Sequence, residues 1–233
     1  VTLKNSANWE TKSSYSFTVS ASDGVTTPAT QNVVVSVTNL DEVSPTMTSG
    51  TTGSVAENAA TTTVIYTASA TDSADTTAGV TYSLSGTDAA LLNIDSTSGA
   101  VTLKSSANYE GKSSYSFTVS ASDGVTTPAT QNVVVSVTNL DEVAPSITSG
   151  ATATAINENS GAGQTVYTAT STDTTDYVSG STTYSLKNTG DYSLLGINAT
   201  TGAVTLVANP DYETKNSYSF TVIATDAAGN ASE

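Results

Sequence analysis

Apolar and polar residues alternate along many short segments of this chain. The alternation is clearest where serine and threonine separate apolar residues, at Tyr115, Phe117, Val119 and Ala121 and again at Val133, Val135 and Val137. A period of two places the apolar side chains on one face of an extended strand and the polar ones on the other. Turns rich in glycine, serine, threonine and aspartate separate further expected strands at 63–70, 80–85, 91–95 and 101–104.

The strand pattern predicts an all-β fold. Helical periodicity is absent, and threonine and valine predominate over good helix formers. The spacing of the segments gives about seven short strands per unit, which is typical of an immunoglobulin-like, Greek-key β-sandwich.

The chain repeats itself. Residues 1–50 recur as residues 101–150 with only six differences, at positions 5, 9, 11, 44, 46 and 47. A more diverged third copy begins at Val204, where Val-Thr-Leu, Tyr-Glu and Tyr-Ser-Phe-Thr-Val follow in the same order with the register shifted to 103 residues. Self-similarity at a fixed period indicates a tandem array of one structural unit.

Unit boundaries are expected just before Pro45 and Pro145, each of which follows a polar Asn-Leu-Asp-Glu stretch. This division gives the C-terminal part of one repeat at 1–43, a complete repeat at 44–143, and a repeat without its last strand at 144–233. The sequence is therefore expected to be an excerpt that begins and ends inside a repeat.

Composition excludes several kinds of chemistry. The chain has no cysteine and no histidine, and its six basic residues are all lysine, which removes the thiol nucleophile and the commonest general base. The formal net charge of −15 disfavours binding to nucleic acid or to anionic membrane surfaces. No apolar run approaches the roughly 18 residues of a membrane span, so direct membrane insertion is not expected.

The acidic residues fall on recurring positions. Comparison of the copies places 17 of the 21 carboxylates on such positions, leaving Asp88, Asp95, Asp191 and Glu233 elsewhere. The recurring positions lie in turns or at strand ends, and a sandwich gathers its loops at two poles. Gathered carboxylates repel one another unless a cation neutralises them. Calcium takes 6 to 8 oxygen ligands without needing histidine or cysteine, so it fits this composition better than magnesium does.

Motifs at these positions resemble those of the cadherin and bacterial cadherin-like repeat family over the whole chain. Asn39 to Pro45 and Asn139 to Pro145 are similar to the family's DxNDN linker and its following proline. The family's glutamate near the first strand has counterparts at Glu57 and Glu158, and its DRE or DYE motif has counterparts at Asp211-Tyr212-Glu213, Asn108-Tyr109-Glu110 and Asn8-Trp9-Glu10. Its paired aspartates correspond to Asp72 with Asp75 and to Asp173 with Asp176. Its aspartate after the sixth strand corresponds to Asp23, Asp123 and Asp226.

The resemblance implies tandem cadherin-like sandwiches with calcium at the joints between repeats. The first joint would bind Ca²⁺ through Glu10, Asn39, Asp41, Glu42, Asp72, Asp75 and Asp123. The second would use Glu57, Glu110, Asn139, Asp141, Glu142, Asp173, Asp176 and Asp226. Asparagine replaces aspartate in two of the three DYE-like motifs, so fewer or more weakly bound ions are expected than in the family's full motif.

The resemblance also implies an extracellular protein of the cell surface, secreted and bacterial, that acts as a rod-like stalk or in calcium-dependent adhesion. Homophilic, glycan or protein contacts are the partners it suggests. Catalysis is not expected, because acid pairs such as Asp41 with Glu42 recur identically in successive units without an aromatic-lined pocket.

Two alternatives remain open at the level of sequence. The sandwich itself could be a carbohydrate- or protein-binding module, with tyrosines such as Tyr109 as a platform, although Tyr115 sits at an inward strand position. Alternatively, residues 31–40 of another chain could supply the strand missing from the last repeat, which would make the chain a filament subunit.

Overall fold

The computed structural model describes residues 1–72, 79–174, 176 and 180–233. The chain divides into two compact units, Val1–Thr138 and Asn139–Glu233. The described residues form β-strands and two short 3₁₀ turns, which confirms the all-β fold class. The boundary between the units places the whole segment from Asn139 to Pro145 in the second unit.

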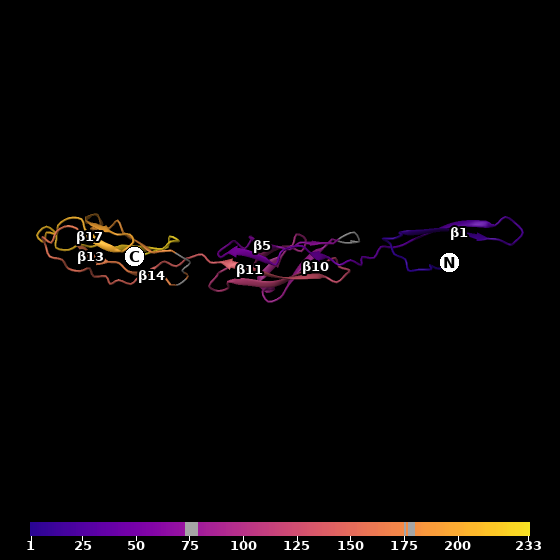
Figure 1. Cartoon of the computed structure of the whole chain (residues 1–233), viewed down its shortest axis with the longest axis horizontal. Helices are drawn as coiled ribbons and strands as arrows, with labels where there is room; N and C mark the ends of the chain where they lie inside the picture. The colour runs from indigo at the N-terminus through magenta and orange to yellow at the C-terminus, as the bar shows by residue number, and fades with distance from the viewer. Residues whose placement is uncertain (73–78, 175, 177–179) are drawn as a thin grey trace. The chain divides into compact units, whose positions relative to one another are not determined.

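The first unit contains a hairpin followed by one repeat (Figure 1). The hairpin pairs β1 (Ser14–Ala21) with β2 (Ala29–Ser36) antiparallel. The elements of the repeat are β3 (Thr46–Met47), β4 (Thr52–Ala56), β5 (Val64–Thr67), β6 (Ala70–Thr71), β7 (Thr81–Ser85), η1 (Ala89–Leu91), β8 (Leu92–Ile94), β9 (Ala100–Leu103), β10 (Ser114–Ser122) and β11 (Ala129–Thr138).

The strands of this repeat form two principal sheets, of order β4-β11-β10-β7 and β5-β9-β8, with a small pair of β3 and β6. Strand β11 lies antiparallel to β10 and parallel to β4. Strands β10 and β11 run side by side in Figure 1. Leaving aside β3 and β6, which have two residues each, the described part of the repeat contains the seven strands that the sequence predicts.

The alternating pattern of the sequence produces the core. Phe117, Val119, Val133 and Val135 are at most 2% exposed, so the inward positions of β10 and β11 are closed off from water. Removing apolar side chains from water in this way is the main stabilising contribution to such a sandwich. The ring of Phe117 packs edge-to-face on Tyr66 of the opposite sheet, with ring centroids 5.9 Å apart.

The second unit repeats the same plan with shorter strands. These are β12 (Ser146–Ile147), β13 (Thr165–Thr168), β14 (Ser171–Thr172), β15 (Thr183–Leu186), η2 (Tyr192–Leu194), β16 (Leu195–Ile197), β17 (Ala203–Leu206), β18 (Val222–Thr225) and β19 (Ala231–Ser232). The sheets have the orders β13-β17-β16 and β15-β18-β19, with a pair of β12 and β14. Tyr167 and Phe220 form the equivalent edge-to-face contact, with ring centroids 5.8 Å apart.

A buried aspartate in the turn before η1 forms a hydrogen bond with strand β10. Asp88 is 6% exposed; its Oδ2 accepts the backbone N–H of Ser116 at 2.7 Å and its Oδ1 pairs with Lys112 Nζ at 2.8 Å. Burial raises the pKa of Asp88, but the hydrogen bonds from Lys112 and Ser116 outweigh it and hold that pKa below its ordinary value of 3.8. The carboxylate is therefore a stabilising structural group.

The second unit contains the same hydrogen bond and ion pair. Asp191 accepts the N–H of Ser219 at 2.8 Å and pairs with Lys215 at 2.8 Å. Asp88 and Asp191 thus occupy matching positions, and the sequence-based assignment of both to non-recurring positions was wrong.

We expect Asp88→Ala to lower the free energy of unfolding of the first unit by about 1–3 kcal/mol, because the variant loses the hydrogen bond from the Ser116 N–H and the ion pair with Lys112 that the buried carboxylate makes. Calorimetric unfolding of the chain measures the change. Since the folded-state pKa is lowered, the wild-type advantage should be present above pH 3.8 and be lost as the pH falls through the folded-state value.

Asp95→Asn is the matched control. Asp95 Oδ1 accepts the N–H groups of Thr97 and Ser98, and Asn198 holds the equivalent turn of the second unit through the same pair of bonds. This variant should unfold like the wild type. Equal effects of Asp88→Ala and Asp95→Asn would contradict the role given to Asp88.

Candidate metal centre

Three aspartates from distant parts of the first unit converge at one pole of its sandwich. Asp41 precedes β3, Asp72 follows β6 and Asp123 follows β10. One carboxylate oxygen from each lies within 4.8 Å of the others. Asp41 and Asp123 are each 4% exposed, and Asp72 is half-buried. Strand ends bring these acids together, as the sequence predicts.

The second unit builds the same group from the corresponding elements. Asp141 precedes β12, Asp173 follows β14 and Asp226 follows β18. Their oxygens also lie within 4.8 Å of one another, with Asp141 and Asp226 buried and Asp173 half-buried. Both units therefore place three carboxylates at the same point of the same fold.

Local turns fix the aspartates that follow the long strands. Asp123 Oδ1 accepts the N–H groups of Val125 and Thr126, each at 2.8 Å, while the Thr126 hydroxyl donates to Oδ2. The hydroxyl of Thr126 and the N–H of Val125 hold the pKa of Asp123 below its ordinary value. This carboxylate is negative and already oriented.

Asp226 is held in an equivalent way. Its Oδ1 accepts the N–H groups of Gly229 and Asn230 at 2.6 and 2.8 Å. The Asn230 amide also donates to Asp226 Oδ2 and to the backbone carbonyl of Asp141, both at 2.9 Å. Burial raises the pKa of Asp226, but these bonds outweigh it and the pKa is lowered overall. Asn230 thus ties the carboxylate to the backbone beside a second member of the group.

Several buried oxygens near these groups accept no hydrogen bond from any described residue. They are Oδ1 of Asn39, Oδ1 of Asn139, Oδ1 of Asp141 and both carboxylate oxygens of Asp173. Burial, and then the negative charges of Asp141, Asp226 and Asp176, raise the pKa of Asp173. An acceptor that is removed from water without a donor costs about 1–3 kcal/mol. The arrangement is therefore unfavourable unless a cation contacts these oxygens.

Calcium fits this set of donors. The available atoms are carboxylate and amide oxygens, which are the ligands that Ca²⁺ takes at about 2.3–2.6 Å. Two oxygens on one ion can then lie no farther apart than about twice that distance, and the oxygens of each group, which lie within 4.8 Å of one another, are close enough to share an ion. Magnesium requires a tighter octahedron with shorter bonds and retains its waters, so it fits less well.

Glutamates occupy the other pole of the repeat in the first unit. Glu57 is 3% exposed and its Oε2 accepts the N–H of Tyr109 at 3.0 Å. A carboxylate oxygen of Glu110 lies within 4.8 Å of one from Glu57. In the second unit Glu158, Asp211 and Glu213 form the corresponding group, and all three are exposed.

Not every residue predicted from the sequence joins a group of three. Asp176, at a positive φ of 65°, accepts the backbone N–H of Glu142 at 2.8 Å. Among the described residues, Glu10 and Glu42 belong to no group of three carboxylates, and both are exposed. Asp75 lies outside the described residues.

Three acidic residues that the structure groups were not among the ligands predicted from the sequence: Glu158, Asp211 and Glu213. The complete Asp-Tyr-Glu motif at 211–213 was the signal that could have identified them. The structure places that motif beside Glu158 although the two are more than 50 residues apart in the sequence.

Comparison with known proteins gives a consistent result. The model of the cadherin domain matches residues 51–138 and again residues 152–233. Mouse and human cadherin EGF LAG seven-pass G-type receptor 2 are each 35% identical over 218 residues. Human protocadherin Fat 4 is 29% identical over 220 residues. The alignments cover 91% of this chain but only 7% and 4% of those proteins.

Solved structures show the same fold. The crystal structure of human protocadherin-24 EC1-2 is 26% identical, with a TM-score of 0.63 over 80% of this chain and 88% of that one. Mouse protocadherin-24 EC1-3 has a TM-score of 0.62 over 98% of this chain and 79% of that one, at 21% identity. Because the cadherin model matches two successive segments that each carry the fold and the carboxylate groups, this chain belongs to the cadherin family.

Proposed function

We propose that these repeats form part of an extracellular, cell-surface protein and act as a calcium-stiffened stalk or in calcium-dependent adhesion. One observation carries the proposal: two units independently place three aspartates together, beside buried oxygens to which no described residue donates. The relatives are cadherins and protocadherins, which supports an adhesive role over an enzymatic one.

In this proposal the two aspartate groups provide the centre of each calcium site. Asn39 and Asn139 supply neutral oxygens beside them, and Asp75 and Asp176 supplement the paired aspartates. Glu10 and Glu42 at the first joint, and Glu57, Glu110 and Glu142 at the second, complete the ligand sets from the preceding repeat and the linker. Bound calcium supplies the positive charge that the acidic groups lack.

Ligands drawn from two successive repeats would restrain their relative motion. Interfaces between domains of one chain are usually modest, so such domains move unless something locks them. With the carboxylates neutralised, the joint is stiff; without neutralisation, their mutual repulsion opens it. Extracellular calcium modules bind at about 10⁻⁴–10⁻³ M, which matches the calcium level outside cells.

The near-identity of neighbouring segments favours the stalk over a dedicated carbohydrate- or protein-binding module. Only six of the first 50 residues differ from residues 101–150, and copying units adds length without creating a distinct binding face. Tyr115 is 6% exposed and packs in the core, so it is not available as a sugar platform. Homophilic or surface contacts and a bacterial source remain predictions from the sequence. None of the described residues belongs to a helix long and apolar enough to cross a membrane.

We expect Asp123→Asn to weaken calcium binding at the first site by about tenfold or more, because affinity in such sites depends on the number of charged ligands. Isothermal titration calorimetry of the whole chain measures this change. Asp173→Asn should have the same effect on the second site. Unchanged binding in both variants would refute the assignment.

Asp23→Asn is the matched control for Asp123→Asn. Asp23 holds the same turn through Val25 and Thr26, but it belongs to no group of three carboxylates among the described residues. The control should therefore bind calcium as the wild type does. A comparable loss in both variants would mean that the turn, rather than the group, determines the effect.

Chelation should also change the shape of the particle. We expect the maximum dimension in small-angle X-ray scattering to shorten, or its distribution to broaden, when calcium is removed. A variant carrying both Asp141→Asn and Asp173→Asn should lose most of that response at its own joint. Identical scattering with and without calcium would contradict the mechanical role.

A further inference from the structure

Two asparagines of this chain begin the Asn-X-Ser/Thr motif that N-glycosylating enzymes recognise. The motifs are Asn198-Ala199-Thr200 and Asn230-Ala231-Ser232. Neither has proline in the middle position, so both are complete acceptors at the level of sequence. The two side-chain amides lie in very different surroundings in the folded protein, and this difference decides which of them can carry a glycan.

Asn198 closes the tight turn between β16 and β17. Its Oδ1 accepts the backbone N–H groups of Thr200 and Thr201 at 3.0 and 2.9 Å, as asparagine side chains often do in turns. The backbone N–H of Asn198 donates to the carbonyl of Ala203, and that of Gly202 donates to the carbonyl of Asn198, both at 2.9 Å. The oxygen end of the side chain is therefore fixed by the turn.

The nitrogen end of the same side chain is free. Asn198 Nδ2 donates to none of the described residues, and Asn198, Ala199, Thr200 and Thr201 are all exposed. Because the two bonds that close the turn use only Oδ1, a substituent on Nδ2 leaves both of them intact. A bulky, hydrophilic group at this position can extend into water.

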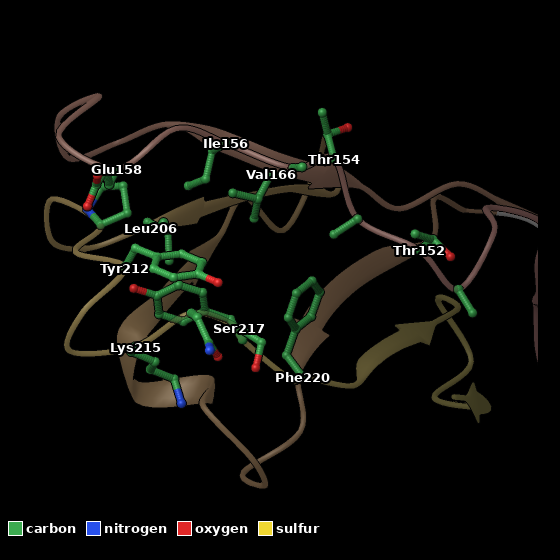
Figure 2. Close-up of a pocket in the computed structure, with 16 residues that line it drawn as sticks. Thr152, Thr154, Ile156, Glu158, Val166, Leu206, Tyr212, Lys215, Ser217 and Phe220 are labelled. Atoms are coloured by element: carbon green, nitrogen blue, oxygen red, sulfur yellow. The ribbon is translucent and has the colours of Figure 1, made fainter.

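The opposite side of the turn is packed against the unit. Gly202 has a φ of 68°, and a Cβ at its position would lie 2.4 Å from the carbonyl oxygen of Ala169. In the sheet that carries the turn, Val166 and Leu206 are 7% and 2% exposed. Figure 2 shows both side chains turned toward the interior of the unit. The core therefore holds the turn, and only the Asn198 side of it faces water.

The amide nitrogen of Asn230 is not free. It donates to Asp226 Oδ2 and to the backbone carbonyl of Asp141, both at 2.9 Å, which uses both of its hydrogens. The Ser232 hydroxyl of the same motif donates to the carbonyl oxygen of Pro145, and Asn230 is half-buried. A glycan on this nitrogen would replace one hydrogen and break a bond beside the aspartate group.

The first unit has an aspartate in the place of Asn198. Asp95 Oδ1 accepts the N–H groups of Thr97 and Ser98 at 3.0 and 2.7 Å, and the turn is exposed in both units. Each turn follows a strand, β8 or β16, that pairs with only one other strand among the described residues. Such edge strands invite pairing with other chains, and a nearby charge discourages it. Asn198 keeps the turn but lacks the charge.

We propose that Asn198 is an N-glycosylation site and that Asn230 is not. The sugar donor is an oligosaccharide linked to a polyprenyl pyrophosphate, and the enzyme is a membrane-bound oligosaccharyltransferase. A bond forms between Asn198 Nδ2 and C1 of the first sugar while the bond from C1 to the pyrophosphate oxygen breaks. The amide gives one proton to a base of the transferase, and the polyprenyl pyrophosphate leaves. The hydrophilic glycan then covers the end of β16.

The inference rests on the extracellular location proposed above, because the transferase acts on chains that enter the secretory route. It does not depend on calcium, since Asn198 is not among the predicted ligands. Any host whose secretory route contains such a transferase can use the site.

Secretion of the 233-residue chain from cultured human cells, behind an added signal peptide, tests the proposal. Peptide N-glycosidase converts each glycan-bearing asparagine to aspartate, and digestion in heavy-oxygen water marks the conversion for mass spectrometry. We expect conversion at Asn198 in most secreted chains and none at Asn230. Secreted chains without a glycan at Asn198, or with one at Asn230, would overturn the proposal.

The variants separate the motif from the turn. Thr200→Ala should remove the glycan, whereas Thr200→Ser is the matched control that keeps the motif and should keep the glycan. Asp95→Asn creates an Asn-Ser-Thr motif in the exposed turn of the first unit and should add a second glycan. A glycan that persists in Thr200→Ala, or an Asp95→Asn chain with no second glycan, would contradict the role given to the exposed turn.

Calorimetric titration with calcium keeps this proposal distinct from the calcium sites. Asn198→Asp should lack the glycan, fold through the bonds that Asp95 makes in the first unit, and bind calcium as the wild type does. A secreted chain that binds calcium but carries no glycan would refute the glycosylation site alone. A chain that is glycosylated at Asn198 but binds no calcium would refute the calcium sites alone.

Discussion

The main electrostatic constraint on this structure is the repulsion between carboxylates that lie close together at one pole of each sandwich. Asp141, Asp173 and Asp226 place three carboxylates within 4.8 Å of one another, and both oxygens of Asp173 are buried with no donor among the described residues. Charges this close repel strongly wherever water is excluded. A turn and the Asn230 amide fix the carboxylate of Asp226, whereas Oδ1 of Asp141 and both oxygens of Asp173 need a cation to balance their charge.

The β-sandwich explains how acids so far apart in the sequence meet. Each acid lies just beyond the end of a strand, and the strands themselves are held by an alternating core that the acids do not enter. Asp123 follows a strand whose Phe117 and Val119 are almost completely buried. The core therefore positions the carboxylates rigidly, and it does so identically in two units that differ in loop length. Such rigidity favours a site that is ready for its ion and a joint that stiffens once the ion is bound.

Most of the fold could be predicted from the sequence, because period-two alternation directly reports which face of a strand is buried. The convergence of Asp41, Asp72 and Asp123 could be predicted in outline, since loops of a sandwich gather at its poles. The role of Asp88 could not, because its partner Lys112 is distant in sequence and a shift of 103 residues hides its match with Asp191.

The most direct measurement is the anomalous scattering of a crystal grown in calcium. The predicted result is a peak inside each aspartate group, at about 2.3–2.6 Å from oxygens of Asp41, Asp72 and Asp123 and likewise from oxygens of Asp141, Asp173 and Asp226. Carboxylates that turn outward to water, with no anomalous peak between them at saturating calcium, would contradict the assignment of these groups as the calcium sites of the chain.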